Sequence, residues 1–134
     1  MRSRERNASV VALGCAVSAG VHAALVPEHL REAPQLGVAF VVATGLLLAA
    51  AIGVAIRPGD ARAARAAQVL LVGLLAGYLA SRTAGIPLLE PRREPADALG
   101  LATKAVELLA LLFTLRLPQT AGGRRPPLNQ EVAR

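Results

Sequence analysis

The chain has 134 residues, 54% of them hydrophobic, and 15 basic against 9 acidic residues give it a formal net charge of +6. A mean hydropathy of +0.47 is too high for a soluble domain of this length and excludes the ordinary globular classes. The basic residues stand at the ends of apolar segments instead of forming one basic face, which argues against nucleic-acid binding.

Four apolar segments follow one another along the chain: 10–26, 36–56, 61–79 and 98–117. A helix needs roughly 20 residues to cross about 30 Å of hydrocarbon, and each segment is close to that length. The sequence therefore predicts an all-α, four-transmembrane-helix bundle over residues 1–117. The remaining residues, 118–134, are rich in Pro, Gly and Arg and are predicted to form a disordered basic cytoplasmic tail.

Arginines set the predicted orientation. One side of the membrane receives ten of them, namely Arg2, Arg4, Arg6, Arg57, Arg62, Arg65, Arg116, Arg124, Arg125 and Arg134. The other side receives only Arg31, Arg82, Arg92 and Arg93. By the positive-inside rule both termini are cytoplasmic. The abundance of Arg, Ala and Gly indicates a bacterial source, so we expect a multi-pass protein of the bacterial plasma membrane.

The first segment also has two features of processing signals. Basic residues precede it, as in a secretory signal peptide, but residues 21–24 match a cleavage site poorly. The string Leu13-Gly14-Cys15 resembles a lipoprotein box, but the apolar run before Cys15 is too short. We therefore interpret the segment as a membrane helix that ends at Pro27, because proline cannot donate the next helical hydrogen bond.

The connections between the segments carry clear turn signals. A second proline, Pro34, precedes the second segment and predicts an outer turn of roughly eight residues after the first helix. The inner turn is short, and Asp60 is expected to cap the third helix. That helix should end near residues 82–85, and Asp97 is the expected cap of the fourth.

Small residues recur at four-residue spacing and are the predicted packing surfaces. They are Gly45, Ala49 and Gly53 in the second segment, Gly73 and Gly77 in the third, and Gly14 and Ser18 in the first. Such stripes let helix backbones approach closely in lipid. We expect them to pack the four helices against one another, with a dimer face as the alternative.

Polar side chains within the apolar segments are the candidate functional groups, because a charge costs about 2.5 to 3.5 kcal/mol there on insertion scales. Helical spacing gives three segments one polar stripe each, and depth along the helices places the key groups in the outer half of the membrane. The predicted polar pocket consists of His22, Glu28, His29, Tyr78, Arg82, Lys104 and Glu107. The alternative for Lys104 and Glu107, at i and i+3, is a structural pair that neutralises itself.

Residue types bear on two further functions, metal binding and catalysis. The residues His22, His29 and Glu28 are of the kinds that zinc, copper or iron prefer, but their spacing is no established signature, and structural roles are the favoured alternative. No cofactor is expected. The sequence lacks H-E-x-x-H, G-x-S-x-G, a phosphate loop, a dinucleotide fingerprint and C-x-x-C, so we predict a protein that is not an enzyme and has no catalytic residues.

Two strings resemble a known group of proteins. They are the H-x4-P-E-H string from His22 to His29, and the S-R-T-x-G-I-P string from Ser81 to Pro87, followed by Glu94-Pro95. In these motifs the chain resembles small, uncharacterised four-helix integral membrane proteins of actinobacteria, over residues of about 18 to 108. The resemblance implies the membrane location and the topology, and it implies no activity.

Two functional hypotheses follow. The first is a structural or accessory bundle, partnered by the lipid bilayer and by a larger membrane complex or further copies of the chain. The second is a binding or transport protein that takes a metal ion, a proton or a small anion into the polar pocket.

Overall fold

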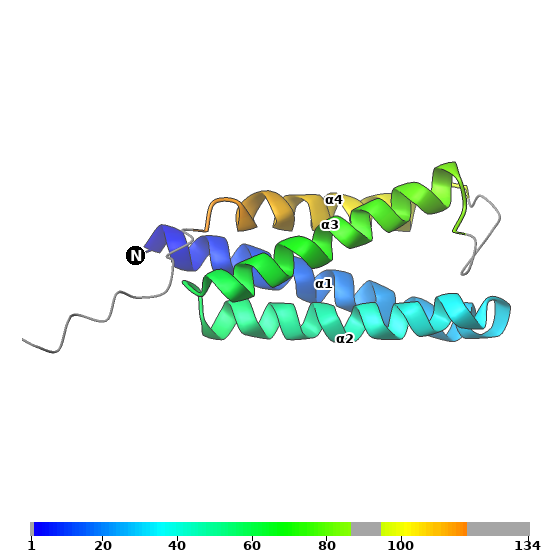
Figure 1. The fold of residues 1–134 in the computed structure, drawn as a ribbon, viewed down its shortest axis with the longest axis horizontal. Coiled ribbons are helices and arrows are strands. Elements are labelled where there is room, and N and C mark those ends of the chain that lie inside the picture. Colours follow the sequence, from blue (N-terminus) through cyan, green and yellow to red (C-terminus); the bar gives the residue numbers. More distant parts are fainter. Residues whose placement is uncertain (1, 87–94, 118–134) are drawn as a thin grey trace, which may run out of the picture.

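The computed structural model describes residues 2–86 and 95–117, and this part of the chain forms four α-helices (Figure 1). They are α1 (Arg2–Glu32), α2 (Pro34–Ile56), α3 (Ala61–Thr83) and α4 (Ala98–Thr114). The first three are long and apolar enough to cross a membrane. The all-α prediction is confirmed. The predicted tail, 118–134, and most of the second outer loop, 87–94, lie outside the described residues.

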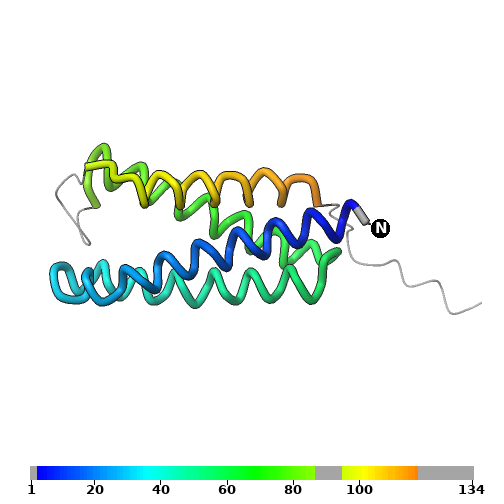
Figure 2. The backbone as a smooth tube through the Cα atoms, turned by 180° about the vertical axis from the view of Figure 1, so that it is seen from behind, coloured from blue at the N-terminus to red at the C-terminus, as the bar shows by residue number. Residues whose placement is uncertain are grey.

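The helices form a ring in which each packs against the next and α4 returns to pack against α1. The chain thus makes two hairpins, α1 with α2 and α3 with α4. Figures 1 and 2 show the hairpins close together at the end that holds the α2–α3 turn, and diverging toward the end that holds the α1–α2 turn. We call these the α2–α3 end and the α1–α2 end.

Large apolar side chains face outward on every helix. Examples are Leu13, Ile52, Val69 and Leu109, which are at least half exposed. The interior is built mainly from small residues instead, with only a few larger side chains such as Leu47 and Leu71. Small residues let helices approach closely, and an outer surface of Leu, Val and Ile suits contact with lipid. This distribution supports membrane residence.

Helix α1 does not end at Pro27, so that prediction is wrong. The helix continues to Glu32, and Ala33 alone separates it from α2 in place of the expected eight-residue turn. A proline inside a helix removes one backbone hydrogen bond. The packing of α1 on α2 offsets this loss: a Cβ at Gly37 would lie 2.7 Å from the Leu30 Cα, so only glycine permits the close approach at the turn.

The predicted helix ends at the other connections are confirmed. The Asp60 side chain accepts a hydrogen bond from the Arg62 backbone at 2.8 Å, and Asp97 accepts one from the Gly100 backbone at 2.7 Å. Both are N-caps of the kind that satisfies an otherwise unpaired N–H. Helix α3 ends at Thr83, and Gly85 follows with a φ of 74°, a left-handed conformation that favours glycine.

The packing role expected of the small-residue stripes holds in the first segment, at Gly14 and Ser18, and fails at Gly45, Gly73 and Gly77. A Cβ at Gly14 would lie 2.7 Å from the Ala110 Cβ, so α1 and α4 approach closely there. At Gly45, Gly73 and Gly77 a Cβ would meet nothing within 4 Å among the residues that the structure describes, and at Gly53 it would make ordinary contact with Ala63 at 3.8 Å.

The glycine stripe of α2 does not pack against the other helices because it lies on the outward face of α2. The buried positions of α2 include Ala43, Leu47 and Ala51. Residues two positions further along, such as Gly45 and Ala49, point to the opposite side of the helix and are exposed. Close packing within the chain by Gly45, Ala49, Gly73 and Gly77 is therefore wrong, and the dimer face stays a prediction.

Candidate functional site

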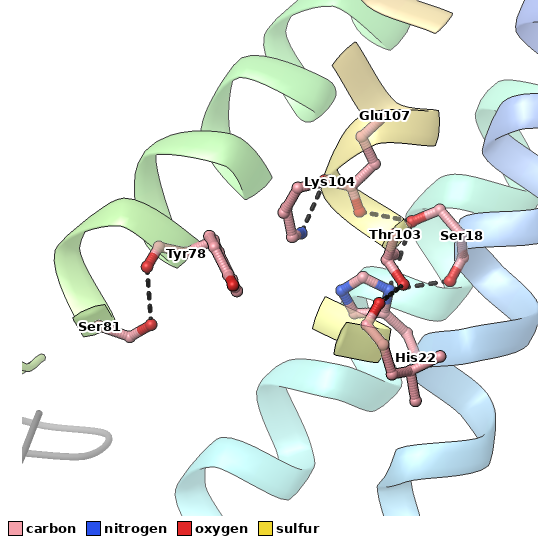
Figure 3. Close-up of polar contacts among 8 residues, drawn as sticks. Ser18, His22, Tyr78, Ser81, Thr103, Lys104 and Glu107 are labelled. Carbon is pink, nitrogen blue, oxygen red and sulfur yellow. Dashed lines mark hydrogen bonds and ion pairs between the residues drawn. The ribbon is translucent and has the colours of Figure 1, made fainter. Parts of the chain in front are cut away.

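A buried carboxylate lies where α1 meets α4. The Glu107 side chain is 0% exposed. Its Oε1 accepts a hydrogen bond from the Ser18 hydroxyl at 2.6 Å, and its Oε2 accepts one from the Lys104 Nζ at 2.6 Å (Figure 3). Both oxygens are therefore occupied and the charge is compensated by one ammonium group, as a buried carboxylate requires.

Each of the two histidines forms a hydrogen bond with the backbone carbonyl oxygen four residues before it on α1. The His22 Nδ1 lies 2.8 Å from the Ser18 carbonyl oxygen, and the His29 Nδ1 lies 2.9 Å from that of Leu25. A carbonyl oxygen only accepts, so each Nδ1 carries the hydrogen and donates it. In the neutral ring the Nε2 is then an acceptor, and its lone pair is available to another group.

An aromatic side chain from α2 separates the histidines. The Phe40 ring centroid lies 5.1 Å from that of His22 and 4.4 Å from that of His29, with the second pair stacked. Because α1 continues past Pro27, the two histidines share one helix face, about 10.5 Å apart along the axis. The three rings together make one continuous aromatic wall, which we call the His–Phe–His wall.

Helix α3 supplies the polar groups opposite this wall. The Arg82 Nη2 donates to the Asp97 Oδ2 at 3.1 Å, and the Arg82 Cζ lies 4.7 Å from the Tyr78 ring centroid. The Lys104 Nζ lies 5.5 Å from the same centroid. Two cations thus lie close to the Tyr78 ring, as aromatic faces favour. Its hydroxyl oxygen is buried and has no hydrogen-bond partner within the described residues.

A cavity of about 730 Å³ lies between the two hairpins near the α1–α2 end. Of the seven residues predicted to form the pocket, six line it: His22, Glu28, His29, Tyr78, Arg82 and Lys104. The seventh, Glu107, lies behind Lys104 and contacts it. The structure therefore brings together side chains from α1, α3 and α4 that are far apart in the sequence.

Several lining residues were not among the candidates. The ring of Phe40 gave no signal in the sequence, because an apolar residue in an apolar segment is unremarkable. Both Gly73 and Gly77, expected to pack helices, line the cavity instead. By contrast Ser18, which holds the Glu107 carboxylate, could have been found: it precedes His22 by one turn on the same polar stripe.

The alternative of a metal centre at His22, His29 and Glu28 does not fit the geometry. Over residues 2–86 and 95–117, no three His, Cys, Asp or Glu side chains are placed to hold one ion. The Phe40 ring lies in contact with both imidazoles, so they cannot converge on a shared ligand. We therefore correct the metal-site alternative for these three residues.

Similarity to other proteins offers no guide to the site: no protein-family model, curated protein or solved structure matches the chain. What the site can bind is therefore inferred from the contacts of its side chains. The Lys104 ammonium has three N–H donors and Glu107 accepts one of them, while the Tyr78 hydroxyl and the His22 Nε2 are available for a further partner. The arrangement can therefore bind a polar group within an apolar cavity.

Proposed function

We propose that the chain is a small multi-pass protein of the bacterial plasma membrane that binds a small molecule in the cavity between its two hairpins. In this proposal all four helices cross the membrane, both termini are cytoplasmic, and the cavity lies in the outer half. The basic residues at the α2–α3 end support the orientation, among them Arg57, Arg62, Arg65 and Arg116.

Helix α4 is the proposed fourth span. Its 17 residues reach about 25 Å, at the short end of what a membrane helix needs. Its outward side chains include Leu101, Leu108, Leu109 and Leu112, each about half exposed. Its polar residues Thr103, Glu107 and Thr114 are buried against the other helices. This is the distribution expected of a helix that meets lipid on one side and protein on the other.

The orientation has a direct test. Green fluorescent protein fused after Arg134 should fluoresce, and alkaline phosphatase fused at the same position should be inactive, because phosphatase folds only outside the cytoplasm. An active phosphatase fusion would contradict the cytoplasmic C-terminus. It would also move the cavity to the inner half of the membrane.

The observation that carries the binding function is the composition of the cavity. Polar groups from three helices line it, namely His22, Tyr78 and Lys104, and the buried Tyr78 hydroxyl has no partner within the described chain. Buried polar groups are nearly always hydrogen-bonded, so a bound ligand would complete this one. The volume falls within the roughly 300 to 1,000 Å³ of small-molecule sites. Binding is favoured over transport, since the hairpins close together toward the α2–α3 end.

A structural or accessory role is the second candidate. The observation that favours it is the outward stripe of Gly45 and Ala49, where a helix of another subunit could approach the backbone of α2. The two roles are compatible, because this stripe lies outside the cavity lining.

Filling the cavity should abolish binding. A leucine at Gly77 would extend into the cavity, and its Cβ would meet nothing within 4 Å among the described residues, so Gly77→Leu should fold normally. The matched control is Gly20→Leu, equally free of contacts but outside the cavity and outside the stripe of Gly45 and Ala49. The measurement is mass spectrometry of small molecules extracted from protein in native nanodiscs. Wild type and Gly20→Leu should hold a stoichiometric molecule that Gly77→Leu lacks, and equal yields from all three would contradict the proposal.

A further inference from the structure

We propose that the ligand of the cavity is a quinone-type lipid, that is, a flat uncharged ring with oxygen atoms at its edge and an apolar tail. This inference rests on the proposed binding function and adds the chemical class of the ligand. Four properties of the cavity support it: its charge balance, its hydrogen-bonding groups, its aromatic faces and its opening.

The charge balance favours an uncharged ligand. The cations in the cavity wall are already paired, Lys104 with Glu107 and Arg82 with Asp97. An anion beside Lys104 would add a second negative charge close to the buried Glu107, and the exposed carboxylates of Glu28 and Glu32 also line the cavity. A cationic ligand would meet Lys104 and Arg82. Charges of either sign are therefore opposed by a like charge nearby.

The hydrogen-bonding groups match ring oxygens. The Lys104 ammonium and the Tyr78 hydroxyl are donors at the cavity, and a carbonyl oxygen can accept from both. The His22 Nε2 is an acceptor, because its Nδ1 hydrogen is committed to the Ser18 carbonyl. A ring hydroxyl of the reduced, hydroquinone form can donate to this nitrogen. One cavity thus offers partners to both forms of such a ring.

Aromatic surfaces on two sides suit a flat ring. The His–Phe–His wall lies on the side of α1 and α2, and the Tyr78 ring lies on α3. Figure 3 shows Tyr78 and His22 on opposite sides of the space, with Lys104 reaching between them from α4. Aromatic rings attract one another in stacked and edge-to-face geometries, so a ligand ring placed here gains contacts on either side.

The remaining cavity wall accommodates an apolar tail. The side chains of Leu25, Leu36, Leu74 and Leu99 line it, one from each helix. Gly73 and Gly77 leave room along α3, since a Cβ at either would meet nothing within 4 Å over residues 2–86 and 95–117. The cavity is partly open to its surroundings, so a tail can extend out of it. A lipid-soluble ligand would enter by the same route.

The test is a titration of the nanodisc-embedded protein with menaquinone-2, a naphthoquinone with a short isoprenoid tail. The chain has two histidines, so ¹⁵N-histidine labelling gives one set of imidazole signals for each. We expect a saturable shift of the His22 Nε2 signal. Decanoate and decylamine, which join charged heads to a tail, should produce no saturable shift. Absence of a saturable shift with menaquinone-2, or equal binding of decanoate, would overturn the proposal.

The variant Tyr78→Phe separates binding from folding. Since the Tyr78 hydroxyl has no hydrogen-bond partner among residues 2–86 and 95–117, its removal should leave the melting temperature unchanged. Loss of one hydrogen bond to the ligand should weaken menaquinone-2 binding about fivefold. The control Ser9→Ala removes a hydroxyl outside the cavity and should bind as wild type does. Equal affinity of Tyr78→Phe and wild type would overturn the role of Tyr78 and with it the proposed ligand geometry.

The two proposals fail in different ways. If wild type holds a stoichiometric molecule that Gly77→Leu lacks, but menaquinone-2 does not bind, the binding function stands and the quinone class is wrong. If no such molecule is held and menaquinone-2 does not bind, both are wrong.

Discussion

Replacing Lys104 with methionine is expected to lower the free energy of unfolding by about 3 to 5 kcal/mol. The side chain of Glu107 is 0% exposed, and Lys104 is the cation that pairs with it at 2.6 Å. Methionine keeps the length and apolar character of the lysine stem but removes the charge. The carboxylate is then left in the interior with the Ser18 hydroxyl as its one remaining donor in the described part of the chain. A charge stranded in this way is more costly than the loss of the pair itself.

The double variant Lys104→Met with Glu107→Gln identifies the cause. It removes both charges together, so most of the lost stability should return, since a neutral amide can still accept from Ser18. As a control, Arg116→Met removes an exposed cation that lies over the Phe113 ring, and it should change stability by no more than about 0.5 kcal/mol. Unfolding by sodium dodecyl sulfate, followed by helical circular dichroism, measures all three. A Lys104→Met single variant as stable as wild type would mean that the pair is not buried.

Replacing Gly14 with leucine is expected to lower the free energy of unfolding by about 3 kcal/mol, the upper part of the range for overpacking. Even a methyl group at Gly14 would lie 2.7 Å from the Ala110 Cβ and 3.6 Å from the Val106 carbonyl oxygen. A leucine must therefore push α1 away from α4. One turn further along α1, Ser18 donates to Glu107, so the same displacement should break this hydrogen bond.

The control is Gly20→Leu, the same substitution on the same helix. A Cβ at Gly20 meets nothing within 4 Å in the described part of the chain, so leucine there should be neutral or stabilising by up to about 1 kcal/mol through its better helix propensity. Combining Gly14→Leu with Ser18→Ala tests the coupling. If displacement already breaks the Ser18 hydrogen bond, the double variant should be scarcely less stable than Gly14→Leu alone. Full additivity of the two losses would show that α1 accommodates the leucine without moving.

The predictions that held depend on local chemistry. Hydrophobic length alone placed the second segment at 36–56, and the structure has α2 at Pro34–Ile56. The caps Asp60 and Asp97 were readable because a carboxylate satisfies backbone N–H groups two or three residues away. Charged residues such as Lys104 and Glu107 stood out as site candidates because they are costly in an apolar segment. Their functional role remains a prediction.

The predictions that failed depend on contacts between distant residues. The continuation of α1 beyond Pro27 could not be predicted from the neighbouring residues, because it depends on the packing of Leu30 against Gly37 of the next helix. The four-residue spacing correctly placed Gly45 and Ala49 on one face of α2. Which face of α2 turns inward is decided by the helices that pack against it. The position of Phe40 in the cavity wall could not be predicted for the same reason, because it depends on contacts with two histidines of another helix.

By itself, the sequence determined that the protein is helical, how long its apolar helices are, where two of its caps lie and which ionisable groups are out of place in lipid. Each of these follows from interactions within a few residues, or between a side chain and the solvent. Only the tertiary structure decided that Ser18 and Lys104 share one carboxylate, that Gly14 holds α1 against α4, and that the diverging hairpins leave a cavity of about 730 Å³. These depend on the angle between packed helices, which close contacts at a few positions fix and which no single segment encodes.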